Sequence, residues 1–203
     1  MSHQRPEDLR PDWKRELPVL TGPTVTLREP VAQDLPALVD LLSTSDATRF
    51  ALEEDDIEVA ALTLIERARR EREKGTAFVY VAIVTGTRQI VGAFQVRALD
   101  ALCETAEWEG TLLPSVRGTN LFIESARLIG TFAFGTLGTN RLEARVLLQH
   151  GRANGALRKL GAVQEGVLRR AVRRNGAYFD QVLWSVLKDD WTDHWLSSAA
   201  RVH

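Results

Sequence analysis

Cysteine, long apolar runs and a secretory leader are the features that this sequence lacks or has least of. Cys103 is the single cysteine in 203 residues, which excludes an internal disulfide and a cysteine-based metal site and is typical of a reducing compartment. No run of about 18 apolar residues is present to span a membrane. The polar, mixed-charge start has no apolar segment of a secretory signal. We therefore expect a cytoplasmic protein.

Metal-ligand spacing and an excess of basic charge are also absent. The four histidines are scattered, without HxH or HxxxH spacing, so we expect no metal ion. The net charge is −1; because a nucleic-acid partner needs an uncompensated basic surface, we expect none. The composition is that of an ordinary globular protein, 44% hydrophobic and 26% charged, at a length that suits one substantial core.

The chain divides into three expected parts. Residues 1–20 hold three prolines and many charges, so we expect an N-terminal arm there, with Trp13 as the residue that docks it onto the body. The apolar pattern is then dense and continuous, without a linker or a repeat, and residues 21–190 are expected to form one domain. Residues 191–203 are expected to form a C-terminal tail.

Apolar periodicity predicts a mixed α+β fold. Alternation with a period of two predicts strands, and apolar residues spaced three and four apart predict amphipathic helices. Antiparallel strands come first, and a strand–helix–strand–helix–strand order follows, which favours one α+β domain. Strands are expected over 24–29, 78–84, 89–97, 104–113, 142–148, 164–170 and 178–187, and helices over 33–42, 57–73, 120–137, 151–160 and 189–197.

The loop before the helix that begins near Asn120 is a candidate anion site. The first turn of a helix has unpaired N–H groups and the positive end of the helix dipole. Gly118 permits close approach of the backbone, and Arg117 adds a charge-assisted contact. On these residues alone an ordinary strand-to-helix turn is the better interpretation, since one glycine before a helix is common. GxGxxG and GxxxxGK[ST] are absent, so dinucleotide-binding and P-loop interpretations have no support.

Four segments, in order between Thr24 and Trp191, carry a resemblance to a known family. They are TVTLREPVAQDLPAL, EGTLLPSVRGTNLFIESARLI, the pair AFGTLGTNRLEARV and NGALRKLGAVQEGVLRR, and GAYFDQVLWSVLKDDW. Their order and spacing resemble the GNAT superfamily of N-acetyltransferases, in the RimJ/RimL-like branch that acetylates the N-termini of ribosomal proteins. The second segment looks like the coenzyme A signature of that branch.

The resemblance implies the GNAT acyl-CoA N-acyltransferase fold: a mixed, mostly antiparallel central sheet with helices on both faces. It also implies that the strand ending at Leu113 and the strand starting at Leu142 run parallel and splay apart, with the arm of acetyl-CoA between them. The residues that it implies for cofactor binding are Leu112, Leu113, Val116, Arg117, Gly118, Thr119 and Asn120, all through the backbone.

The chain departs from the family pattern at two positions that matter for chemistry. His150 stands where relatives commonly have an asparagine that binds the cofactor arm, and Ala153 stands where they have a serine that is a candidate proton donor. His150 can supply either function, or it is only a loop or helix-cap residue, and both interpretations stay open. Asn154 is a further polar candidate for cofactor binding.

For the general base, Glu107 is the first candidate, because it occupies the position of a frequent glutamate of the family on the central strand. A salt-bridged strand residue is the alternative. Glu109 lies on the same strand face by the two-residue period, either as a wall of the amine pocket or as a replacement base. The catalytic candidates are therefore Glu107, His150 and Glu109.

The resemblance implies an acetyl-CoA-dependent N-acetyltransferase, whose primary amine attacks the thioester directly. The acceptor is a protein N-terminus or a small amine, and a monomer or homodimer is expected. The alternative is a catalytically weak GNAT-fold protein that senses acyl-CoA or serves as a partner subunit. An acidic run over 53–56 would favour a cationic acceptor, although a solvated helix start is the better explanation of it.

Overall fold

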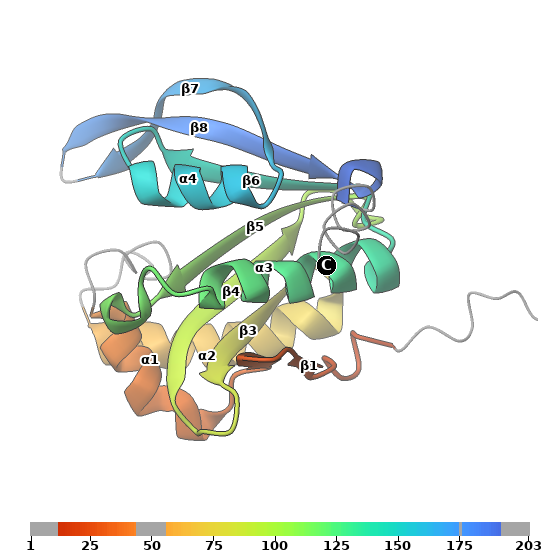
Figure 1. The fold of residues 1–203 in the computed structure, drawn as a ribbon. Helices are drawn as coiled ribbons and strands as arrows, with labels where there is room; N and C mark the ends of the chain where they lie inside the picture. The colour runs from red at the N-terminus through yellow and green to blue at the C-terminus, as the bar shows by residue number, and fades with distance from the viewer. Residues whose placement is uncertain (1–11, 44–55, 175, 192–203) are drawn as a thin grey trace, which may run out of the picture.

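A mixed sheet organises the chain in the computed structural model, which describes residues 12–43, 56–174 and 176–191. Its strands are β1 (Leu20–Thr21), β2 (Val25–Arg28), β3 (Ala77–Val84), β4 (Ile90–Ala98), β5 (Thr105–Leu112), β6 (Arg141–Leu147), β7 (Val163–Arg174) and β8 (Ala177–Leu187). They lie in the order β1-β2-β3-β4-β5-β6-β8-β7 (Figure 1). Neighbours are antiparallel except β5 and β6, which are parallel.

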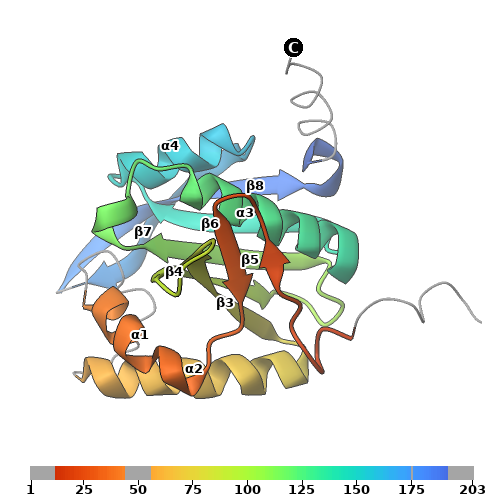
Figure 2. The same cartoon turned by 60° about the horizontal axis from the view of Figure 1, so that its bottom comes forward.

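Helices cover both faces of the sheet. One face carries α1 (Leu35–Leu42) and α2 (Ile57–Lys74), and the other carries α3 (Leu121–Phe132) and α4 (Gly151–Lys159) (Figure 2). A π-helical turn, Ala133–Leu137, extends α3. No helix in the described ranges is both long and apolar enough to cross a bilayer. The predicted α+β architecture, a mixed and mostly antiparallel sheet with helices on both faces, is thus the observed one.

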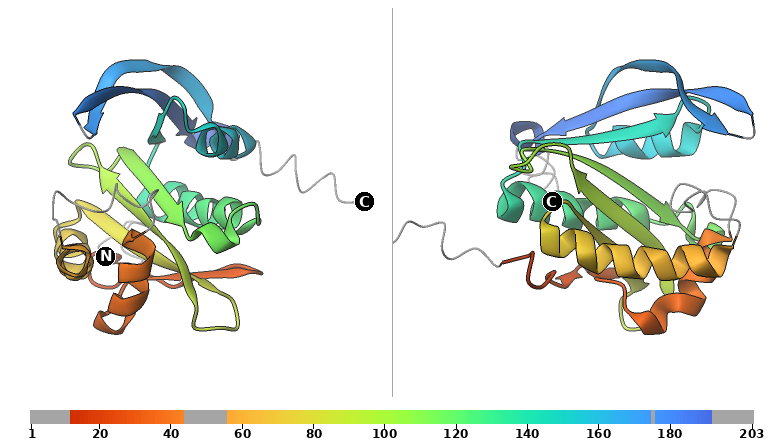
Figure 3. Two further views of the ribbon diagram at one scale, coloured as in Figure 1. Left: turned by 90° about the vertical axis from the view of Figure 1, so that its left-hand side faces the viewer. Right: turned by 180° about the vertical axis from the view of Figure 1, so that it is seen from behind.

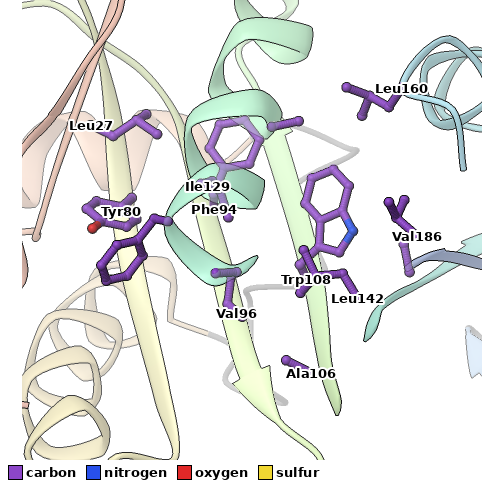
Figure 4. Packing of buried hydrophobic residues seen from close by; sticks show 14 of the residues in the cluster. Leu27, Tyr80, Phe94, Val96, Ala106, Trp108, Ile129, Leu142, Leu160 and Val186 are labelled. Carbon is purple, nitrogen blue, oxygen red and sulfur yellow. The ribbon is translucent and has the colours of Figure 1, made fainter. Parts of the chain in front are cut away.

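Two apolar clusters hold these layers together, one on each face. The alternation of β3 sends Phe78 and Tyr80 to the cluster under α3 and sends Val79 and Val81 to the cluster under α1 and α2. Each set is almost fully buried, as expected for a strand covered on both sides. Figure 4 shows the first cluster, in which Trp108 of β5 lies between the sheet and α3.

Capping residues set the limits of α2. Its N-cap, Asp56, accepts hydrogen bonds from the N–H groups of Glu58 (2.9 Å) and Val59 (3.4 Å), which satisfies two of the donors that a helix start leaves unpaired. Its C-cap, Gly75, has φ +72°, a left-handed conformation that glycine adopts without a steric penalty. Asp56 is the one member of the acidic run 53–56 that falls in the described ranges, and it has this structural role.

The segment expected to be an arm is joined to the core along its described part. Leu17 is buried, and the ring of Trp13 meets Phe78 at 5.6 Å between centroids. The hydroxyl of Tyr80 donates to the carbonyl of Pro18 (2.9 Å). Trp13 therefore docks as the sequence analysis expected, and the first strand begins at Leu20, inside the predicted arm. Residues 1–11 lie outside the described part.

The end of the described chain also packs on the body. Residues 188–191 are helical, at the start of the helix predicted over 189–197, whose remainder lies outside the described residues. Trp191 is buried against Phe134, with 5.5 Å between the ring centroids. A side chain at Gly130 would meet the Trp191 ring at 2.6 Å, so the glycine makes room for this contact.

Candidate active site

The parallel strands β5 and β6 are joined at one end only. Their pairing, Thr105 with Arg141, Ala106 with Leu142 and Glu107 with Glu143, stops there although both strands continue for several residues within the described ranges. The strands diverge toward the ends of their arrows (Figures 1 and 3). The sheet thus splits into two halves, β1–β5 and β6–β8, as the sequence analysis expected of a splayed pair.

Backbone groups of β5 face the split. The N–H of Leu113 donates to Val91 of β4 (2.8 Å), and because ladder bonding alternates along an antiparallel pair, the groups of Gly110 and Leu112 point to the other side, toward β6. The prediction for Leu112 fits this geometry. For Leu113 the N–H is bonded to β4 and the carbonyl accepts from Val116 (3.2 Å), so its role in cofactor binding stays a prediction that would rest on the second lone pair of that carbonyl.

A cavity of about 430 Å³ occupies the open part of the split. Its walls are the end of β5, the loop before α3 with the first turn of that helix, and α4 from its first residue to its last. This volume lies in the range of small-molecule and cofactor sites. Among the residues expected to bind the cofactor, the lining includes Leu112, Val116, Arg117, Gly118, Thr119 and His150 but not Leu113, Asn120 or Asn154.

The loop before α3 presents a small number of backbone donors to this cavity. Gly118 has φ +84°, a conformation that favours glycine, and a side chain there would meet no atom within 4 Å. Its N–H has no hydrogen-bond partner among the described residues. The same holds for the N–H of Asn120, although Asn120 does not line the cavity. The N–H groups of Val116 and Arg117 are bonded to Leu113 and Pro114 (both 3.2 Å). Five amides, those of residues 116–120, were expected to bind an anion. Fewer of them remain for this role, because hydrogen bonds within the turn already use those of Val116, Arg117 and Thr119.

Cationic side chains from two elements line the same cavity. Arg117 comes from the loop, and Arg152 and Lys159 come from α4; none of the described residues that line the cavity is acidic. Because the two α4 residues are seven positions apart, they lie on the same helix face. Sequence reasoning missed this pair, although that spacing was the signal that could have found it. The cavity therefore favours an anionic ligand.

His150 is the N-cap of α4 and lines the cavity. Its Nδ1 accepts a hydrogen bond from the N–H of Ala153 (3.1 Å), which requires that Nδ1 carries no proton, so in the neutral ring the proton is on Nε2. The helix-cap interpretation is thus the observed geometry. It leaves Nε2 as a donor, so a role in cofactor binding or proton donation stays a prediction.

Asn154 has a structural role in the fold, and its expected role in cofactor binding stays a prediction. Its Nδ2 donates to the carbonyls of Leu147 and His150 (both 3.0 Å), and its Oδ1 accepts from Nε1 of Trp184 (2.8 Å). The side chain is buried. It joins the end of β6, the start of α4 and β8, and no part of it lines the cavity.

Glu107 lies in an ion-pair network on the sheet face opposite α3. One oxygen is 2.5 Å from Nη2 of Arg97, and the other is 3.8 Å from Nε of Arg145. Glu143 pairs with the same Arg145 (3.7 Å) and with Arg141 (2.9 Å). This is the geometry of the salt-bridged alternative, and the role of Glu107 as a base stays a prediction.

Glu109 shares the face of Glu107 and borders a smaller cavity of about 40 Å³ farther inside the split, together with Gly110 and Ala153. Trp108, between the two glutamates in sequence, is buried on the opposite face, as the two-residue period predicts. Phe122 and Ala153 line both cavities, so the smaller cavity, which Glu109 borders, adjoins the larger one. Within the described residues no group of three or more metal-binding side chains occurs.

A buried carboxylate that sequence reasoning missed secures α3. Glu124, in the first turn of α3, accepts hydrogen bonds from the N–H groups of Thr24 (2.8 Å) and Val25 (3.2 Å) and from the Thr24 hydroxyl. A side chain at Gly22 would meet its Oε1 at 2.2 Å. The β1–β2 turn is therefore fixed against the helix whose start lines the cavity.

Comparisons with known proteins identify the family to which this fold and site correspond. Residues 24–163 match the acetyltransferase (GNAT) domain. The uncharacterized N-acetyltransferase YoaA of Bacillus subtilis (strain 168) is 24% identical over 172 residues, which are 84% of this chain and 97% of YoaA.

Solved structures share the fold at low sequence identity. RimJ of Mycobacterium smegmatis, in complex with CoA-disulfide, superposes with a TM-score of 0.75 at 21% identity, over 95% of this chain and 98% of RimJ. RimL, a ribosomal L7/L12 alpha-N-protein acetyltransferase in complex with coenzyme A, gives 0.75 at 18% identity, over 85% and 99%. The expected fold is confirmed.

Proposed function

The chain belongs to the GNAT acetyltransferase family, and we propose that it transfers an acetyl group from acetyl-CoA to the primary amine of a protein N-terminus or a small molecule. The observation that carries this proposal is the cavity of about 430 Å³ in the split between β5 and β6, whose lining includes Gly118, with its unbonded N–H, and three cationic side chains. The family match supports the fold, and the cavity supports the binding of an anionic cofactor.

The residues present fit coenzyme A. The N–H of Gly118, Arg152 and Lys159 would hold the diphosphate, because a phosphate gains most from donors that are already cationic or pre-oriented. The backbone groups of Gly110 and Leu112 would bond the amide-containing arm as an additional strand would. Acetyl-CoA supplies an acyl group already activated as a thioester.

The transfer forms a C–N bond and breaks a C–S bond, so one proton must leave the amine and one must reach the thiolate. The Nε2–H of His150 would donate a hydrogen bond to the departing thiolate, because the cap bond from Ala153 occupies Nδ1 and leaves Nε2 as the donor. The proton that the thiolate finally takes comes from solvent water, and the one lost by the amine passes through a base to solvent. A backbone N–H of β5, from Gly110 or Leu112, would stabilise negative charge on the thioester oxygen.

For the proton of the amine we propose a carboxylate on the opposite face of β5. Glu109 borders the split at the smaller cavity, and Glu107, two residues earlier on the same face, is paired with Arg97 and Arg145. Because it borders the cavity, Glu109 is the nearer candidate for direct proton removal. Glu107 acts through a water or maintains the charge balance of the face.

An acyl-CoA sensor is the second candidate function, since Ala153 carries no proton donor where relatives have serine. The test separates the two. Thermal unfolding with and without acetyl-CoA measures binding, and thiol release with a panel of amines and peptides measures turnover. Binding with turnover supports the enzyme. Binding without turnover on any acceptor supports the sensor, and no thermal shift at saturating acetyl-CoA refutes both.

A further inference from the structure

The β7–β8 hairpin extends past the rest of the sheet. β6 pairs with β8 only from Leu187 back to Gln181, while β7 and β8 stay paired as far as Arg174 and Ala177. The projecting part lies at the end of the molecule where α3 begins (Figures 1 and 3). We call residues 168–180 the hairpin tip.

The hairpin tip concentrates positive charge. It contains four arginines and one aspartate, a net charge of +3 in a chain whose total is −1. Arg169, Arg170 and Arg173 are exposed, and none of these three forms an ion pair within the described residues. By contrast, β2, α2, β4 and β6 each contain at least one arginine in an ion pair with a carboxylate, for example Arg97 with Glu107 (2.5 Å).

An exposed aromatic ring holds two of these guanidinium groups in place. Arg170 and Arg173 lie over the ring of Tyr178, with their Cζ atoms 5.7 and 5.9 Å from its centroid. Stacking of this kind orders a guanidinium while its N–H edge remains directed outward. The cations are therefore pre-oriented for a planar anion such as a carboxylate.

Two hydrogen bonds and a short stretch of chain link the hairpin tip to the rim of the cavity. The N–H of Arg170, at φ +52°, donates to Oδ1 of Asp180 (2.8 Å). The carbonyl of Asp180 accepts from the N–H of Leu148 (2.9 Å). His150, two residues farther along, lines the cavity. Left-handed backbone at a non-glycine residue is unfavourable and is maintained here by the Asp180 bond.

We propose that the hairpin tip docks acidic side chains of a polypeptide acceptor whose N-terminus enters the split. This rests on the proposed function and narrows its acceptor to an acidic chain. An RNA fits less well, because a few charges on a chain of net charge −1 give little attraction for a long polyanion.

The experiment uses the full chain with acetyl-CoA and peptides of equal length. Each peptide has a free N-terminal serine, followed by a segment rich in glutamate, glutamine or lysine. Thiol release gives kcat and KM for the wild type, for the Arg169→Glu/Arg173→Glu double variant, and for Arg88→Glu. Arg88 is an exposed residue of the β3–β4 turn and serves as the matched control. Thermal shift with acetyl-CoA verifies that each variant is folded.

We expect the wild type to favour the glutamate-rich over the lysine-rich peptide by about tenfold in kcat/KM at ~0.05 M NaCl, and less at ~0.5 M, because salt screens exposed charges. The double variant should lose the preference through KM, with kcat unchanged, while Arg88→Glu keeps it. The same preference in the double variant overturns the proposal, as does equal use of all peptides. The proposal is also overturned if an RNA homopolymer inhibits acetylation of the peptides and an excess of the acidic peptide does not relieve this inhibition.

The two levels of inference fail differently. Turnover of small amines without turnover of any peptide overturns the docking surface and leaves the acetyltransferase standing. If acetyl-CoA causes no thermal shift and no amine is turned over, the proposed function is overturned, and the docking surface with it.

Discussion

Replacing Gly118 by proline should remove most of the affinity for acetyl-CoA. Gly118 has φ +84°, and proline fixes φ near −65°, so the backbone would have to rotate by about 150° at this residue. The variant also lacks the N–H, which has no partner among the described residues and so remains for a phosphate. A hydrogen bond to a charged group contributes about 1.5–3 kcal/mol, which corresponds to a roughly ten- to 150-fold rise in Kd.

Thermal unfolding and titration calorimetry measure this effect. At an acetyl-CoA concentration about 100 times the Kd of the wild type, binding stabilises the fold by about 2.7 kcal/mol; after a 100-fold loss of affinity only about 0.4 kcal/mol remains. Gly118→Ala is the control. It keeps the N–H, its side chain meets no atom within 4 Å, and it costs about 1–2 kcal/mol of folding stability through its positive φ. A proline variant that binds as tightly as wild type would refute the assignment of this loop.

Three further changes test the rest of the site. Glu107→Gln should lower kcat more than it raises the KM for acetyl-CoA, measured by steady-state thiol release, and unchanged turnover would make Glu107 purely structural. His150→Asn, which restores the residue common among relatives, should keep both the cap and activity, whereas His150→Ala should lose about 1 kcal/mol of stability together with turnover; equal activity of both variants would exclude His150 from the chemistry. The guanidinium of Arg141 and the hydroxyl of Ser185 lower the pKa of Glu165 from 4.5 to about 2. Its stabilisation is therefore fully present above about pH 4.5 and is lost as the pH falls toward 2, so Glu165→Gln should flatten the fall in the free energy of unfolding across that window, and an unaltered acid limb would contradict the ion pair.

Most of the elements could be predicted because their signals are local. The two-residue alternation of β3 and the three-and-four spacing of α2 each follow from which face is buried. Gly138 and Gly161, read as helix stops, have φ +82° and +80°, the left-handed conformation that ends helices. β1 escaped prediction because two residues are too short to show a period, and its identity as a strand depends on its pairing with β2.

The site was harder to predict because its residues are chosen by pairing between distant segments. Whether Leu112 or Leu113 faces the split depends on the register of β5 against β4, which no local pattern specifies. Asn154 was a reasonable polar candidate, but its partner Trp184 is 30 residues away. Glu107 is paired with Arg97 of β4 and Arg145 of β6, the strands on either side of β5. Only the order of the strands in the sheet brings these three residues together.

The short junction between β5 and β6 has a mechanical consequence. Three residue pairs at one end join the two halves of the sheet, so that end serves as a hinge and the opposite end as the free side of a clamp. A ligand that forms hydrogen bonds to both halves would join β5 and β6 where the two strands are not paired with each other. Hydrogen exchange at β6 and β8 should then slow when the clamp is filled, as the two halves lose their independent motion.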